Sequence, residues 1–192
     1  MKALKVVFPV MIALVVAACA KPPQADIDAA RAAVAAAAKN ADIVAYAPDT
    51  LKSAQDKLAQ MESELTAKHY DKVKALALDA KATAGTAAND AATNKAKAQA
   101  DATALIAALK QAVPDDMKKV AAAKRVRGIK LDFATLTKQL ADAQAAVTDA
   151  DTDLSNGDFA SALQKANAVQ AQLTAGEKTV ADAIQAASSR KK

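Results

Sequence analysis

Residues 122–154 read AAKRVRGIKLDFATLTKQLADAQAAVTDADTDL, and the spacing of apolar residues in this stretch decides the fold class. Intervals of four and three positions alternate along it: Ala122, Val126, Ile129, Phe133, Leu136, Leu140, Ala143, Val147, Ala150 and Leu154. This spacing places one apolar stripe along a single face of an α-helix, which must pack against another helix to leave water. We therefore expect one long helix here, with Gly128 inside it but off the apolar face.

The same alternation continues on both sides of this stretch. It covers residues 27–65, with a change of phase beside Pro48, then residues 70–112 and finally residues 159–180. Alanine, the strongest helix former, supplies 56 of the 192 residues, whereas there are 4 glycines, 5 prolines and no tryptophan. These features predict an all-α protein of long antiparallel helices, forming an elongated, coiled-coil-like up-down bundle over residues 25–188.

Proline and glycine positions predict where these helices bend or end. Pro48 predicts a kink or a brief break near Tyr46–Asp49, because proline lacks an amide hydrogen and clashes with the preceding turn. Pro114, followed by two aspartates, predicts the end of the second helix and the start of the third. Ser155-Asn156-Gly157-Asp158 predicts a tight turn, with its glycine left-handed and its aspartate capping the fourth helix.

Four helices joined by short turns predict a polarity for the rod. A first helix over residues 25–67 extends roughly 60 Å outward, and each later helix reverses direction. The turns at His69 and Asn156 then lie at the far tip, while the C-terminus returns beside the N-terminus. We therefore expect basic residues 118–130 near the N-terminal end and acidic residues 149–158 at the tip.

An internal repeat appears at an offset of 89 residues. Residues 44–91 and residues 133–180 each predict a helical hairpin with an aromatic residue just after its turn. The matched pairs are Val44 with Phe133, Leu51 with Leu140, Ala54 with Ala143, Leu58 with Val147, Leu65 with Leu154, Tyr70 with Phe159, Val73 with Ala162, and Ala77 with Ala166.

Residues 1–18 have the layout of a bacterial signal peptide. Lys2 and Lys5 precede a nearly continuous apolar stretch, which is too short for a comfortable transmembrane helix. The residues Val16, Ala17 and Ala18 then resemble a lipobox, because they stand directly before Cys19, the single cysteine of the chain. We expect cleavage before Cys19 and lipidation of its sulfur, the alternative being an ordinary signal peptide that contains a cysteine.

The expected lipid predicts where in the cell the protein is located. Two or three acyl chains, palmitate among them, hold a protein stably at a membrane, because each buried methylene contributes about 0.8 kcal/mol. Residues 19–24 then form an extended spacer, and Ala20 and Lys21 resemble the outer-membrane sorting pattern of enterobacteria. We expect an envelope protein facing the periplasm. Without residues 1–18 the net charge is +3, which is too small to indicate nucleic-acid binding.

Ala45-Tyr46-Ala47-Pro48 is followed by Leu51, Ala54 and Leu58, then by Tyr70 and a run of alanines at helical spacing. This pattern resembles a family of small bacterial lipoproteins that carry an alanine-rich domain of unknown function. The resemblance covers roughly residues 41–91, with a weaker echo at 133–180. It implies a helical hairpin and supplies no activity. Tetratricopeptide repeats are a rival match, with helices far shorter than those predicted here.

The sequence contains no convincing catalytic constellation. His69, the only histidine, falls at a predicted turn, where a capping or solvated role competes with catalysis or metal binding. Asp149, Asp151 and Asp153 resemble the start of a calcium loop, but Leu154 and Ala160 replace the glycine and glutamate that such a loop requires. We therefore expect no catalytic residue, no cofactor and no metal.

One group of basic residues has two interpretations: Lys118, Lys119, Lys124, Arg125, Arg127 and Lys130. They form either a solvated helix face or a surface that contacts an anionic partner.

These observations favour a non-enzymatic, lipid-anchored helical rod with a structural or protein-interaction role, its partner an envelope protein. The C-terminal Arg190-Lys191-Lys192 resembles the basic end of Braun-type lipoproteins, whose last lysine is joined to peptidoglycan. A tether through Lys192 is thus the alternative. A carrier or chaperone that uses exposed helix faces is a third hypothesis.

Overall fold

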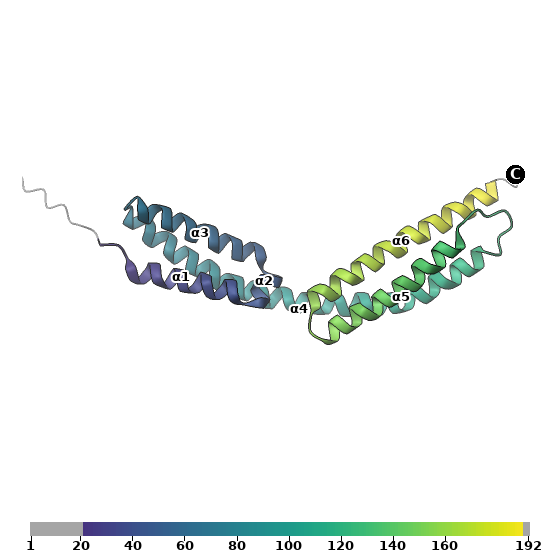
Figure 1. Ribbon diagram of the computed structural model, residues 1–192, viewed down its shortest axis with the longest axis horizontal. Helices are drawn as coiled ribbons and strands as arrows, with labels where there is room; N and C mark the ends of the chain where they lie inside the picture. Colours follow the sequence, from purple (N-terminus) through teal and green to yellow (C-terminus); the bar gives the residue numbers. More distant parts are fainter. Residues whose placement is uncertain (1–20, 190–192) are drawn as a thin grey trace, which may run out of the picture.

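The computed structural model describes residues 21–189 (Figure 1). This part of the chain forms six helices and no strand, so the predicted all-α class is confirmed. The helices are α1 (Gln24–Lys39), α2 (Ala41–Tyr46), α3 (Pro48–Thr66), α4 (Tyr70–Ala123), α5 (Phe133–Ser155) and α6 (Phe159–Ser189). The predicted signal peptide, the lipobox, Cys19 and Lys192 lie outside the described residues.

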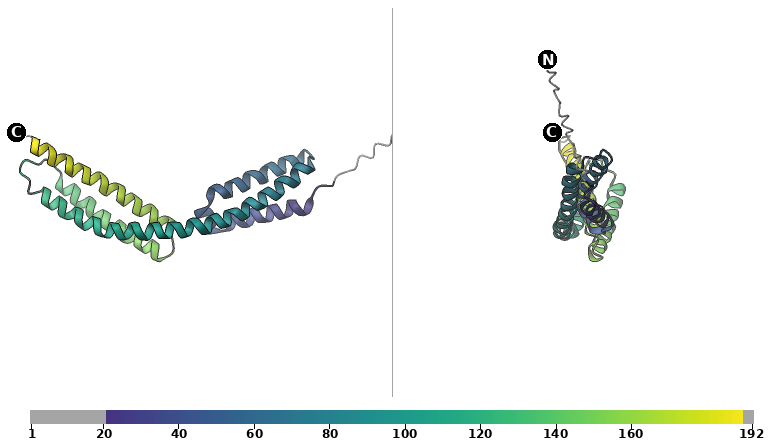
Figure 2. Two further views of the ribbon diagram at one scale, coloured as in Figure 1. Left: turned by 180° about the vertical axis from the view of Figure 1, so that it is seen from behind. Right: turned by 90° about the vertical axis from the view of Figure 1, so that its left-hand side faces the viewer.

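Helix α4 joins two helical bundles (Figures 1 and 2). It has 54 residues and is therefore about 80 Å long. Its first half packs against α1, α2 and α3, and its second half packs against α5 and α6. Each bundle has its own core: residues from Ile27 to Ala91 form one cluster of buried side chains, and residues from Ala102 to Val180 form the other.

The first bundle corrects the predicted single helix over residues 25–67. The chain reverses direction between α1 and α3, so that these helices are antiparallel (Figure 1). Asn40 begins the reversal by accepting hydrogen bonds from the amides of Asp42 and Ile43, and Pro48 stands in the first turn of α3. The kink or brief break predicted at Tyr46–Asp49 is thus a break between helices and part of a full reversal of the chain.

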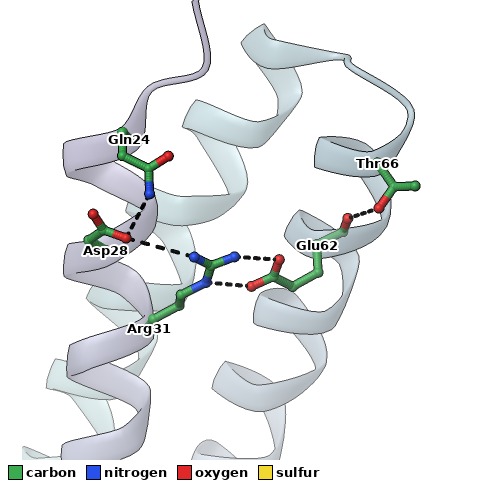
Figure 3. Close-up of polar contacts among 5 residues, drawn as sticks. All are labelled: Gln24, Asp28, Arg31, Glu62 and Thr66. Carbon is green, nitrogen blue, oxygen red and sulfur yellow. Dashed lines mark hydrogen bonds and ion pairs between the residues drawn. The ribbon is translucent and has the colours of Figure 1, made fainter.

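A bidentate ion pair joins the two antiparallel helices (Figure 3). Arg31 of α1 donates from Nε and Nη2 to the two carboxylate oxygens of Glu62 on α3, over 2.7 and 2.8 Å. These bonds hold the pKa of Glu62 below its ordinary value, and Asp28 lies 3.7 Å from the same guanidinium. The contact fixes which residues of α1 and α3 stand side by side.

Between the two cores, α4 crosses a stretch with little cover. From Ala92 to Asp101 no side chain is fully buried. The apolar pattern weakens at the same place, where Asn94 and Asp101 occupy positions that the helical spacing assigns to the core face. The middle of α4 is therefore a solvated connection between two separately packed ends.

Helix α4 continues through Pro114, so the predicted break there is wrong. An interior proline removes one intrahelical hydrogen bond and costs about 3 kcal/mol. Val113 and Val120, on either side, are buried against α5 and α6. Because packing holds both flanks of the helix, the chain tolerates the missing bond.

The helix predicted over residues 122–154 is also interrupted. It ends at Ala123, and α5 begins only at Phe133. Gly128 has a backbone φ of 87°, a left-handed conformation that favours glycine and does not continue a helix. Asp132 then caps α5 by accepting the amide hydrogen of Thr135 at 3.0 Å.

The polarity of the molecule is the reverse of the expected one. Helix α1 begins at one end of α4, beside the α3–α4 turn, whereas residues 124–132 and Ser189 lie at the opposite end (Figures 1 and 2). We call this opposite end the loop end. Basic residues 118–130 therefore lie far from the N-terminal end, and acidic residues 149–158 lie near the middle of the molecule.

The turns α3–α4 and α5–α6 have the same backbone bonds, 89 positions apart. Lys68 donates to the carbonyl of Leu65 over 3.0 Å, and Gly157 donates to the carbonyl of Leu154 over 3.2 Å. Both turn residues have positive φ, 62° at Lys68 and 82° at Gly157. In each bundle this hairpin packs against a further helix, which is α1 in the first and the second half of α4 in the second.

Within residues 21–189, no helix combines the length and the apolar character that crossing a membrane requires.

Candidate functional site

The predicted basic cluster separates into two groups in the structure. Lys118 pairs with Asp115, and Lys119 pairs with both Asp116 and Glu177, so both lysines take part in ion pairs of the second bundle. The other four cations have exposed side chains and form no ion pair with any described residue: Lys124, Arg125, Arg127 and Lys130. These four, which we call the loop cations, remain available for an anionic partner.

The path of the loop explains its exposed charges. Residues 124–127 leave α4 in a turn, and Gly128 redirects the chain so that Ile129 and Leu131 pack against the second core. The four loop cations are exposed to solvent, since burying an unpaired cation is costly. The loop end thus combines an anchored backbone with free positive charge.

A cavity of 490 Å³ lies beside this loop, among α4, α5 and α6. Its lining is predominantly apolar and includes Val126 of the loop. The other apolar residues are Val120, Ala122, Ala123, Leu136, Leu140, Leu173, Gly176, Val180, Ala181 and Ile184, and the polar ones are Asp116, Lys119, Gln139, Gln172 and Glu177. Pockets that bind small molecules have volumes of roughly 300–1,000 Å³ and a similar predominance of apolar lining.

Small residues on facing helices create this cavity. Gly176 occupies a position that the helical spacing of α6 assigns to the core face, and a Cβ placed there would meet no heavy atom within 4 Å. Ala122, Ala123 and Ala181 add further short side chains around the same space. Ile184 is 37% exposed at the loop end of the cavity, which is more than expected for a packed isoleucine.

A polar cluster marks the inner end of the cavity, away from the loop. Asp116 is 5% exposed, and its carboxylate accepts a hydrogen bond of 2.8 Å from Lys119, which also pairs with Glu177 across to α6. Burial raises the pKa of Asp116 above its ordinary value, whereas the bond from Lys119 lowers the pKa of Glu177. The two carboxylates raise the pKa of the Lys119 ammonium in turn.

The other residues considered from sequence form local contacts. His69 lies at the α3–α4 turn, where its Nδ1 is 2.5 Å from Oε2 of Glu64. Asp151 pairs with Lys110, and Asp153 pairs with Lys165, all on helical surfaces rather than on a calcium loop. Among residues 21–189, no three carboxylate, histidine or cysteine side chains converge as metal ligands would.

Sequence reasoning identified the loop cations but missed the cavity. One signal was present: a glycine, Gly176, at a core position of a helix leaves a gap that a larger residue would fill. The sequence also contained a signal for the helix C-terminus before Gly128, because basic residues followed by glycine are typical of helix ends.

Comparison with protein families matches part of the chain. Residues 25–103 match the model of a family described as a domain of unknown function (DUF4398). No curated protein and no solved structure matches the chain. The matched residues cover the first bundle and the solvated middle of α4, so this part of the chain is similar to a helical domain of unknown function. The cavity and the loop cations lie outside the match.

Proposed function

We propose that this protein is a non-enzymatic, lipid-anchored rod of the bacterial envelope that presents its loop end to an acidic partner protein. The observation that carries the proposal is the placement of α1 and the loop cations at opposite ends of α4, about 80 Å apart. A rod with this polarity keeps a membrane at one end and a contact surface at the other.

The anchor rests on the sequence before the described residues. Val16, Ala17 and Ala18 precede Cys19, and α1 begins only five residues later, at Gln24. A lipid on Cys19 would therefore hold the first bundle close to the membrane. Ala20 and Lys21 support sorting to the outer membrane, with the rod facing the periplasm.

The anchor is tested by Cys19→Ala. We expect this variant to remain unprocessed or to leave the membrane fraction, because the thioether cannot form. A matched Ala20→Ser variant keeps the cysteine and should fractionate as the wild type does. Processing and membrane attachment of Cys19→Ala at wild-type levels would contradict the proposal.

The contact surface is tested by charge reversal. Replacing Arg125 and Arg127 by Glu should reduce in-cell crosslinking of the loop end to its partner. The reversal Lys74→Glu with Lys81→Glu, on the exposed surface of the first bundle, should leave crosslinking unchanged. Equal crosslinking in all three proteins would show that the loop cations are not the contact.

A covalent wall tether is the second candidate, and one observation favours it. Helix α6 ends at Ser189 at the loop end, and three more residues reach Lys192, within about 11 Å of it. The last described residue therefore lies at the end of the molecule opposite α1. Digestion of purified cell walls tests it: a muropeptide on Lys192, absent in Lys192→Ala, means a tether, and its absence in wild type rejects one.

A further inference from the structure

The apolar cavity and the loop cations adjoin each other along the chain at Val126. Val126 lines the cavity, and the two residues beside it in the chain are Arg125 and Arg127. Both arginine side chains are exposed and have no ion-pair partner among the described residues. The loop end therefore offers apolar volume next to unneutralised positive charge.

We propose that this surface binds an anionic amphiphile, with its hydrocarbon chain in the cavity and its acidic head beside Arg125 and Arg127. The inference goes beyond the anchored rod and does not depend on it. Val120, Leu140, Leu173 and Val180 supply apolar walls that would take a hydrocarbon chain out of water. The guanidinium groups supply planar donors suited to a carboxylate or phosphate.

The inner end of the cavity sets the orientation of the ligand. Lys119 there is already held by two carboxylates, Asp116 and Glu177, so it does not offer a free cation to an acidic head. These three groups carry one net negative charge when ionised, which disfavours an anion at that end. The acidic head is therefore placed at the loop end, where the free cations are.

The same charges exclude a cationic amphiphile as the preferred occupant. Its head would meet Lys124, Arg125, Arg127 and Lys130, with like charge repelling it. A neutral amphiphile gains the apolar contacts but no charge contact. The proposal therefore ranks three ligands with the same chain: dodecanoate binds more tightly than dodecanol, and dodecanol more tightly than dodecyltrimethylammonium.

Titration calorimetry of the purified full chain tests this ranking below the concentration at which the two ionic amphiphiles form micelles and dodecanol separates from water. We expect saturable binding of one dodecanoate per chain, about tenfold tighter than the ammonium compound, since tenfold corresponds to one modest charge contact. Equal affinity for all three ligands, or uptake without saturation, would overturn the proposal.

Gly176→Leu tests whether the hydrocarbon chain of the ligand enters the cavity. Because an added Cβ meets nothing within 4 Å, the leucine fills the space, and it also favours the helix. We expect at least tenfold weaker dodecanoate binding with unchanged helicity. Gly85→Leu is the matched control, since Gly85 lies exposed on α4 in the first bundle with the same open surroundings. Unchanged dodecanoate binding in Gly176→Leu would show that the hydrocarbon chain binds outside the cavity.

Charge reversal distinguishes the contribution of the acidic head to binding from that of the hydrocarbon chain. Arg125→Glu with Arg127→Glu should weaken dodecanoate binding about tenfold and leave dodecanol binding unchanged. The control Lys81→Glu changes a lysine of the first bundle and should alter neither. A concentration-dependent dimer that Gly176→Leu abolishes would instead show that a second copy of the chain occupies the cavity.

Discussion

The hydroxyl oxygen of Tyr46 accepts a hydrogen bond of 3.3 Å from the backbone amide of Ala160, and this bond joins the two bundles directly. The same tyrosine is fixed from its other side, because Asn94 donates to its carbonyl over 2.8 Å. Lys95 lies 6.0 Å from the centre of its ring. Tyr46 thus connects the end of α2, the solvated middle of α4 and the start of α6.

Tyr46→Phe removes the only polar atom of this side chain. We expect the angle between the bundles to vary more widely, while each bundle keeps its own core. Spin labels on exposed Gln60 and Gln170, one in each bundle, should show a broader distance distribution. Tyr70→Phe is the control, and a distribution as narrow as the wild type would show that α4 alone sets the angle.

The two equivalent turns predict opposite effects of exchanging their central residues. Lys68 has a left-handed φ of 62°, which costs a residue with a Cβ about 1–2 kcal/mol. Glycine at this position removes the cost, but part of the gain is lost because glycine makes the unfolded chain more flexible. Lys68→Gly should therefore raise the free energy of unfolding by about 0.5–1 kcal/mol, and Gly157→Lys should lower it by about 1 kcal/mol, in urea denaturation. Changes of the same sign would contradict this.

Leu140 tests the second core. It is 8% exposed on α5 and belongs to the buried cluster, so Leu140→Ala should lower the free energy of unfolding by about 2–5 kcal/mol. The internal repeat pairs Val44 with Phe133, but the side chain of Val44 is 51% exposed. Val44→Ala should therefore change stability by no more than about 0.5 kcal/mol. A loss below that value for Leu140→Ala would show that Leu140 is not core.

Helical periodicity predicted the class and most buried residues, since a 4-3 spacing leaves one face that must pack. It did not predict the path of the chain. Pro114 and Gly128 compete as helix ends, and only packing of Val113 and Val120 on both sides of the proline decides between them. Helical periodicity does not indicate that the side chain of Asn40 caps α2. This cap begins the reversal of the chain that sets the polarity of the molecule. The cavity depends on three helices at once, which no single periodicity describes.

Asp116 predicts a pH dependence with a definite sign. Its buried carboxyl has a pKa above the ordinary 3.8, so the folded state binds its proton more tightly than the unfolded state. The stabilisation of wild type relative to Asp116→Asn is then greatest in acid and falls as pH rises above about 4 through the raised pKa. Urea denaturation of both proteins across this range measures the difference, in which the contributions of carboxylates distant from Asp116 cancel. A difference that grows with pH would contradict the sign.

The separation of the two ends of the rod decides its polarity. Ala25 lies at the start of α1, beside the α3–α4 turn, and Ser188 lies in the last turn of α6 at the loop end. Because α4 spans both bundles, labels at these exposed positions should be roughly 70–80 Å apart, near the limit of pulsed electron resonance. A four-helix rod folded back on itself would give on the order of 30 Å or less, because its first and last helices would end together.

The pair Ala25 and Lys68, both at the N-terminal end of α4, is the short control. A short distance for both pairs would return Lys192 to the proposed anchor and remove the geometric support for a wall tether. A long distance for Ser188 alone places the C-terminal lysines and the loop cations together, at the end of the molecule where a partner would meet both.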